Sequence, residues 1–403
     1  MTVTETPSTA NLDQTMEPVV AYASPHWSGV APDSQWLARA KALRAPLAEW
    51  AAEHDEKGTF VQEGFDLLTD NKFMSLLVPT ELGGGGATHA EACAVLAELA
   101  KGCPATSLSY SMHSHIVAAQ VWRHHRALSA PVLGRVAADE LTLISTGASD
   151  WIDSSGTATR TDGGFRVSAR KMPASGCPAG DVLVTSVRWE DAPDGQQIVH
   201  CSIPFAANGV SIIETWNTMG MRGTGSHTVV VDDVFVPDEA VALIRPAGQW
   251  HPVWATVLVA ALPLIMSSYI GVAEVAAEAA LALAGRRAER PDIAPQIGRM
   301  LNRLTTARDT VRAMIDAAPT SGSTTPSRPR RLHSPARPMP PKPASTPSGW
   351  QSRSVADRLT ARGRSSSACS ETCTAASTIR WPPRNRSGSA VAWPSASTRS
   401  VNQ

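Results

Sequence analysis

The chain has 403 residues, which is enough for two or three domains with a sizeable core. Its 36 basic and 36 acidic residues balance, so the charge of the whole chain gives no reason to expect nucleic acid or another polyanion as a partner. The six cysteines have neither C-x-x-C nor disulfide-framework spacing. We therefore expect reduced thiols and a cytoplasmic protein.

The first part of the chain predicts a flexible arm followed by a helical domain. Residues 1–30 are polar and contain Pro, Ser and Thr, which is typical of a loose arm. Residues 31–140 contain several segments with apolar residues at helical spacing. These segments are 36–54, 61–71, 89–101 and 105–125. The glycines at 83–86 are not followed by Lys-Ser/Thr, so they predict a turn between helices instead of a phosphate-binding loop.

His113 and His115 lie on one of these predicted helices and invite a metal-site interpretation. Residues two apart on a helix point roughly 200° apart, so the two imidazoles cannot hold one ion. No carboxylate occurs at a matching spacing either. We expect no metal site, and a helix-capping or cofactor-lining role for the histidines.

Residues 141–245 predict a small β-domain between two helical domains. Short runs of branched residues alternate with polar ones and are separated by Gly, Asp and Pro. The runs are 156–162, 165–171, 181–189, 196–205, 209–216 and 226–236. We expect an antiparallel, barrel-like domain, and hence a multidomain α+β fold.

Residues 246–318 predict a C-terminal helical bundle with long helices at 257–284 and 295–318. The uncharged stretch 252–273 is long enough to suggest a transmembrane helix. Pro263 interrupts it, and Glu274 continues the same helical pattern. A buried helix of a bundle is therefore favoured over a membrane span.

Residues 319–403 are dominated by Ser, Pro, Arg and Thr and have no apolar period, which is typical of a disordered tail. Reading the back-translated codons of 368–381 one nucleotide earlier permits Leu-Phe-Arg-Asp-Val-His-Gly-Gly-Leu-His-His-Pro-Leu. We therefore hypothesise a frameshift between about residues 315 and 330, which removes the second half of the bundle. Resequencing of the gene across this region tests the hypothesis.

The order of helical, β and helical domains, together with two motifs, resembles the acyl-CoA dehydrogenase superfamily over residues 35–318. Residues 77–84 read Leu-Val-Pro-Thr-Glu-Leu-Gly-Gly and are similar to the family segment vPeeyGG. Residues 219–224 read Met-Gly-Met-Arg-Gly-Thr, and 234–237 read Val-Phe-Val-Pro. They are similar to the family's MG-x-R-x-(S/T) and V-x-V-P segments, and the motifs together are specific.

This resemblance implies a flavin cofactor and names residues that bind it. Residues 145–150 are similar to a shortened T-E-P-x-A-G-S-D loop, and 171–177 to K-M-W-I-T-N-G with proline in place of tryptophan. By this match Ser149 binds a cofactor phosphate, Ser145 or Thr146 the edge of the flavin ring, and Ser175 the region of flavin N5. Hydroxyl groups suit the polar rim of a flavin, although ordinary turn chemistry is the alternative for serines in such loops.

The leading function that the resemblance implies is α,β-dehydrogenation of an acyl-CoA thioester in lipid metabolism, with electrons passed to FAD and then to an electron-transfer flavoprotein. That reaction needs a carboxylate base. One family position for the base falls near Ala261, and the other lies in the tail, so no catalytic residue can be named.

Two alternatives remain open. The Arg-Asp-x-His string of the shifted frame resembles the flavin monooxygenases of the superfamily, which use FMN or another flavin that a partner reductase has reduced. The chain would then be the oxygenase component of a two-component flavin monooxygenase. The other alternative is an inactive, truncated flavoprotein product. Family members assemble through the C-terminal bundle, so a homo-oligomer is expected as well.

Overall fold

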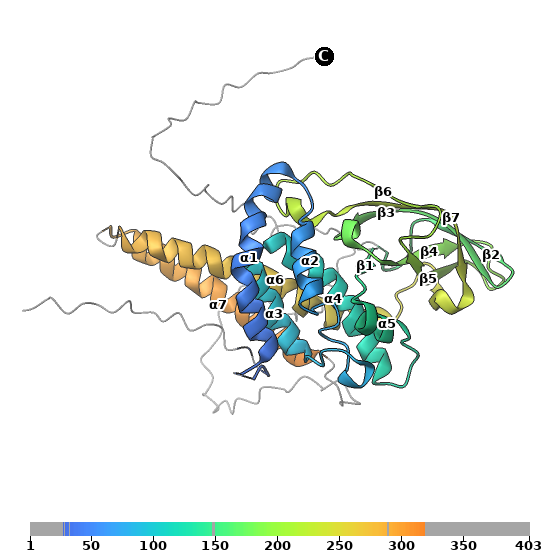
Figure 1. The fold of residues 1–403 in the computed structure, drawn as a ribbon, viewed down its shortest axis with the longest axis horizontal. Helices are drawn as coiled ribbons and strands as arrows, with labels where there is room; N and C mark the ends of the chain where they lie inside the picture. Colours follow the sequence, from blue (N-terminus) through green and yellow to red (C-terminus); the bar gives the residue numbers. More distant parts are fainter. Residues whose placement is uncertain (1–26, 28, 32, 147–149, 288–289, 319–403) are drawn as a thin grey trace, which may run out of the picture.

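The computed structural model describes residues 27, 29–31, 33–146, 150–287 and 290–318. Helices α1 to α5 come first, a β-sheet follows, and the helices α6 and α7 form a hairpin that extends away from the sheet (Figure 1). Most of the predicted arm and the whole tail lie outside the described residues. The tail's disorder, the frameshift and the domain boundaries therefore stay predictions.

The four helices that the sequence predicts in the first part are present. The helices of this part are α1 (Gln35–Lys57), α2 (Gln62–Asp70), α3 (His89–Gly102), α4 (Pro104–His124) and α5 (Val132–Asp139), with a short 3-10 turn, η1 (Thr80–Leu82). Ser34 begins α1 by accepting a hydrogen bond from the backbone N–H of Leu37 at 3.3 Å. Thr88 and Glu91 form a capping box at the start of α3. Local side chains therefore set where these helices begin.

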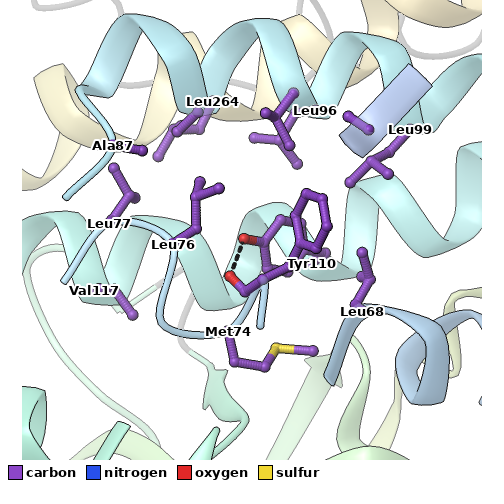
Figure 2. Packing of buried hydrophobic residues seen from close by; sticks show 14 of the residues in the cluster. Leu68, Met74, Leu76, Leu77, Ala87, Leu96, Leu99, Tyr110, Val117 and Leu264 are labelled. Carbon is purple, nitrogen blue, oxygen red and sulfur yellow. Dashed lines mark hydrogen bonds between the residues drawn. The ribbon is translucent and has the colours of Figure 1, made fainter. Parts of the chain in front are cut away.

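These helices share an apolar core with the segment that follows α2, and Figure 2 shows part of it. Tyr110 of α4 is buried and its hydroxyl donates to the carbonyl of Phe73, so the one polar atom of that ring is satisfied. The glycine run forms a turn, as predicted. A Cβ on Gly84 would lie 2.3 Å from the Cβ of Val78, so only glycine fits there.

The described strands form one open sheet in the order β6-β7-β3-β2-β4-β5-β8, with β1 beside β4. They are β1 (Leu143–Ser145), β2 (Thr157–Thr161), β3 (Gly164–Ala174), β4 (Val182–Trp189), β5 (Gln197–Pro204), β6 (Val210–Ile213), β7 (His227–Pro237) and β8 (Val241–Pro246). Among the described residues β6 and β8 do not pair, so the predicted barrel-like closure is not found. The two halves of the sheet meet through a single β2–β4 pair, Thr157 with Arg188.

The prediction of an antiparallel domain is correct for most pairs but wrong for two of them. β1 and β2 each pair with β4 in parallel. Neither pair is joined by a hairpin, and only hairpin-connected neighbours are constrained to run antiparallel. β1 follows the helical part of the chain, and no hairpin joins it to β4.

Helix α6 (Val253–Gly285) and helix α7 (Ile293–Ala317) form the predicted C-terminal hairpin. By length and composition alone α6 is apolar enough to cross a membrane, and half of its most apolar window is buried. It packs against α3, α4 and α7 and carries the buried Glu274 on its contact face. This packing supports the interpretation of α6 as a bundle helix.

Candidate functional site

Three of the four predicted cofactor-binding residues lie at two neighbouring strand ends. Ser145 ends β1 and Thr146 follows it, while Ser175 follows the end of β3. A Cβ on Gly176 would lie 3.6 Å from the side chain of Ile144, so the segment after β3 lies against β1. Thr146 donates from its hydroxyl to that of Thr185 on β4 at 2.6 Å. Ser149 lies outside the described residues, and its predicted role stays a prediction.

Ser175 belongs to a row of three hydroxyl groups that the sequence did not reveal. Its Oγ lies 2.8 Å from the Oγ of Ser226, and the Oγ of Ser226 lies 2.8 Å from the Oγ1 of Thr224. Ser226 and Thr224 are buried, whereas Ser175 is half-buried at the open end. We call Ser175, Ser226 and Thr224 the hydroxyl row.

Two methionine side chains of the β-domain are unusually exposed. Met172 is 63% exposed and Met219 is 71% exposed. The hydroxyl of Thr215 donates to the sulfur of Met172 at 3.7 Å, which links the end of β3 to the segment after β6. Exposed methionine side chains can provide an apolar surface for a flat ring.

His227, next to Ser226, organises the backbone that follows β6. Its Nδ1 accepts hydrogen bonds from the backbone N–H groups of Thr215 and Trp216, both at 3.2 Å. Burial lowers the pKa of His227, although the charge of Glu214 raises it. An imidazole that accepts at Nδ1 carries its proton on Nε2, so His227 is a neutral ring that holds this segment in place.

A buried ion pair anchors the chain just beyond the predicted phosphate residue. Lys171 lies on β3 with its Nζ 2.8 Å from a carboxylate oxygen of Asp150, and both side chains are buried. Burial lowers the pKa of Lys171, and the charge of Asp150 opposes this shift. Arg245 donates to the backbone carbonyl of Asp150 at 3.0 Å. Two cations thus fix the backbone at Asp150.

His113 has a structural role that the sequence did not predict. Its Nε2 lies 2.8 Å from the carbonyl oxygen of Met74, and its Nδ1 accepts the backbone N–H of Leu143 at 3.0 Å. Burial lowers its pKa to about 4, so the ring is neutral. It joins α4 to the start of β1 and caps no helix end. Within the described ranges no group of three His, Cys, Asp or Glu side chains is arranged for a metal ion.

The buried carboxylates of the described residues are all engaged. Ala261 is buried where one family position would place a base. Glu274 on the same helix lies 2.9 Å from Lys101 and 2.7 Å from Arg308. The remaining buried acids are Glu98 beside Lys101, Glu140 beside Ser75 and Asp150 beside Lys171. Each of them thus has a cation or a hydroxyl partner, although one carboxylate oxygen of Glu98 accepts no hydrogen bond.

Comparison with known proteins shows what this chain is similar to. Residues 38–130 match the family model described as Acyl-CoA dehydrogenase, N-terminal domain. The solved structure of KijD3 in complex with FMN and a dTDP-linked amino-keto sugar superposes with a TM-score of 0.63 at 26% identity, over 73% of this chain and 76% of that chain. The fold is therefore that of the acyl-CoA dehydrogenase superfamily, and a flavin cofactor is supported.

Curated relatives include both branches that the sequence suggests. YdbM of Bacillus subtilis, named as an acyl-CoA dehydrogenase, is 29% identical over 265 residues, which is 62% of this chain and 66% of that protein. SfnC of Pseudomonas putida, named as an FMNH2-dependent monooxygenase, is 27% identical over 252 residues, or 60% of each chain. The chain thus spans less than two thirds of the length of these relatives. The resemblance to the superfamily is confirmed, and with it a flavoenzyme relationship.

The chemistry of the site fits a flavin. Hydroxyl groups such as those of Ser145, Thr146 and Ser175 suit the polar edge of such a ring. The sequence named the three hydroxyl residues as candidates from motif similarity, and their binding role stays a prediction. It missed Ser226, although this serine lies only two residues beyond Thr224, the last residue of a quoted motif.

Proposed function

We propose that the chain is the oxygenase component of a two-component flavin monooxygenase, which binds reduced FMN and oxidises a small molecule with oxygen. The observation that carries this proposal is the state of the buried carboxylates. Among the described residues each one is bound to a cation or a hydroxyl, and Ala261 stands at one family position of the base. Dehydrogenation of an acyl-CoA needs such a base, whereas oxygenation by a reduced flavin does not depend on that residue.

The residues at the strand ends would hold the flavin. Ser145 or Thr146 would bond the ring edge, Ser175 the N5 region, and Met172 and Met219 would cover part of a ring face and exclude water. The bound flavin supplies the two-electron chemistry. Ser149 would bind the phosphate. The next residue, Asp150, is held by its ion pair with Lys171. A separate flavin reductase would be the partner that supplies reduced flavin.

The comparisons support this proposal and the dehydrogenase alternative alike. SfnC is named as FMNH2-dependent, KijD3 is seen with FMN, and TdsC, a dibenzothiophene monooxygenase with a TM-score of 0.60, shares the fold. Cytoplasmic location and assembly into a homo-oligomer are further proposals that rest on the cysteine pattern and on the resemblance.

The second candidate is α,β-dehydrogenation of an acyl-CoA with FAD and an electron-transfer flavoprotein. The N-terminal family model and the similarity to YdbM favour it. One pair of experiments separates the two candidates. We expect saturable binding of dithionite-reduced FMN and an altered rate of its reoxidation when oxygen is admitted. Anaerobic bleaching of the FAD-loaded protein by a short-chain or branched acyl-CoA would instead establish the dehydrogenase. Failure to bind FMN or FAD in either redox state would instead support the third alternative, an inactive, truncated product.

Replacement of Ser175 by alanine tests the placement of the flavin. We expect Ser175→Ala to weaken FMN binding about three- to tenfold, because one hydrogen bond to the ring is lost. The measurement is a fluorescence titration of FMN with the full chain. Ser211→Ala is the matched control, since Ser211 is an exposed serine on the edge strand β6. Equal affinities for the wild type and Ser175→Ala would remove Ser175 from the site.

A further inference from the structure

The hydroxyl row ends on a single backbone carbonyl. The carbonyl oxygen of Met221 lies 2.9 Å from the hydroxyl of Thr224, 3.0 Å from the indole Nε1 of Trp216 and 3.2 Å from the backbone nitrogen of Thr224. A carbonyl oxygen has two lone pairs, so three donors exceed its ordinary capacity. Met221 also lies in the left-handed region at φ 53°, which few residues other than glycine adopt. The local fold thus places this carbonyl at the buried end of the row.

Each hydroxyl has one proton, so the row can be ordered in two directions. In the inward order Ser175 donates to Ser226, Ser226 donates to Thr224, and Thr224 donates to the carbonyl of Met221. In the outward order Thr224 donates to Ser226, Ser226 donates to Ser175, and Ser175 donates to a ligand. The Met221 carbonyl keeps two other donors in the outward order, so turning the Thr224 hydroxyl away leaves that carbonyl satisfied.

The two orders present opposite polarity at the open end of the row. With the inward order, Ser175 offers lone pairs and can accept a hydrogen bond from a ligand N–H. With the outward order, Ser175 offers an O–H to a ligand acceptor. The N5 atom of a flavin changes in just this way, because it is an acceptor in the oxidised ring and carries a hydrogen in the reduced ring.

We propose that Thr224 and Ser226 are positioning residues that let the Ser175 hydroxyl reverse and match N5 of both the oxidised and the reduced flavin. This inference rests on the proposed function, since it needs Ser175 to face N5. It goes beyond that function because it assigns a role to two buried hydroxyl groups that do not touch the ligand.

The two orders depend unequally on Thr224, and this inequality makes the proposal testable. In Thr224→Val the inward order leaves the buried hydroxyl proton of Ser226 without an acceptor. The outward order keeps both of the remaining donations, from Ser226 to Ser175 and from Ser175 to the ligand. A buried donor without a partner is costly. The variant should therefore bind reduced flavin poorly and oxidised flavin almost normally.

The experiment measures the affinities of the full-length wild type and variants for FMN and, without oxygen, for dithionite-reduced FMN. We expect Thr224→Val to weaken binding of reduced FMN about tenfold and to change the affinity for oxidised FMN by less than about threefold. Thr224→Ser keeps the hydroxyl and should restore the wild-type ratio of the two affinities. Circular dichroism melting of each variant shows whether the fold is retained.

The outcomes separate this inference from the proposed function. Suppose that Ser175→Ala weakens the affinities for both oxidised and reduced FMN, and that Thr224→Val changes these two affinities by the same factor. The flavin site then stands and the inference is overturned. The inference is overturned too if Thr224→Ser behaves like Thr224→Val, because a hydroxyl is then not what matters. If Ser175→Ala changes neither affinity, the placement of the flavin is wrong, and the inference falls with it.

Discussion

We expect replacement of Lys101 by methionine to lower the free energy of unfolding by about 3–5 kcal/mol, which is typical when one partner of a buried ion pair is removed. The Nζ of Lys101 lies 2.7 Å from Glu98 on its own helix and 2.9 Å from Glu274 on α6. The three side chains are at most 6% exposed. Burial lowers the pKa of Lys101, but the charges of Glu274 and Glu98 outweigh this effect and raise the pKa above its ordinary value. The amine therefore stays charged at neutral pH.

The variant leaves two carboxylates in the interface between α3 and α6. Arg308 of α7 lies 2.7 Å from Glu274, and Arg44 of α1 lies 3.5 Å from Glu98, but neither replaces the bridge between the two acids. Urea denaturation followed by circular dichroism measures the loss. Lys57→Met is the control, because Lys57 pairs with Glu53 on the surface of α1 with both side chains more than half exposed. A surface pair of this kind contributes little. Equal midpoints for the two variants would show that the buried network does not hold the hairpin.

The helices and most strands could be predicted because their signals are local. Ser34 and Thr88 mark helix starts through bonds to residues three positions away, and alternation of branched residues marks each strand. Helix α5 and strands β1 and β8 were not predicted, since all three are short. The order of the strands in the sheet could not be predicted either, because the parallel pairing of β1 with β4 joins residues that no hairpin connects.

The same distinction between local signals and contacts distant in sequence applies to the candidate site. Ser145, Thr146 and Ser175 could be named as candidates because they lie in motifs that are continuous in sequence. The partner of Ser175 could not, since Ser226 is 51 positions away and only the pairing of β3 with β7 brings the two together. His113 is a second example of a role that depends on residues distant in sequence. Its bonds to Met74 and Leu143 depend on the packing of α4 against two distant segments, so a role in joining helix and sheet was not visible in the sequence.

Close approach of α6 to α3 depends on one glycine. A Cβ on Gly271 would lie 2.1 Å from the carbonyl oxygen of Ala97 and 2.9 Å from the Cβ of Ala100. The nearer atom belongs to the backbone of a buried helix, so it cannot turn aside as a flexible side chain would. The two helices would have to separate, which disturbs the hydrogen bond between Ser107 and Ser268 at 2.8 Å and the bridge from Lys101 to Glu274. We expect Gly271→Ala to lower the free energy of unfolding by about 3 kcal/mol for this reason.

Gly285→Ala is the matched control for this variant, since it lies at the end of the same helix and a Cβ there meets nothing within 4 Å. Alanine favours a helix over glycine by about 0.5–1 kcal/mol, so this control should leave stability unchanged or raise it slightly. The opposite signs of the two expected stability changes matter, because helix propensity alone predicts that both substitutions stabilise the protein. Thermal and urea unfolding of the two variants side by side therefore tests the α3–α6 contact itself. A Gly271→Ala protein as stable as Gly285→Ala would mean that α6 lies farther from α3.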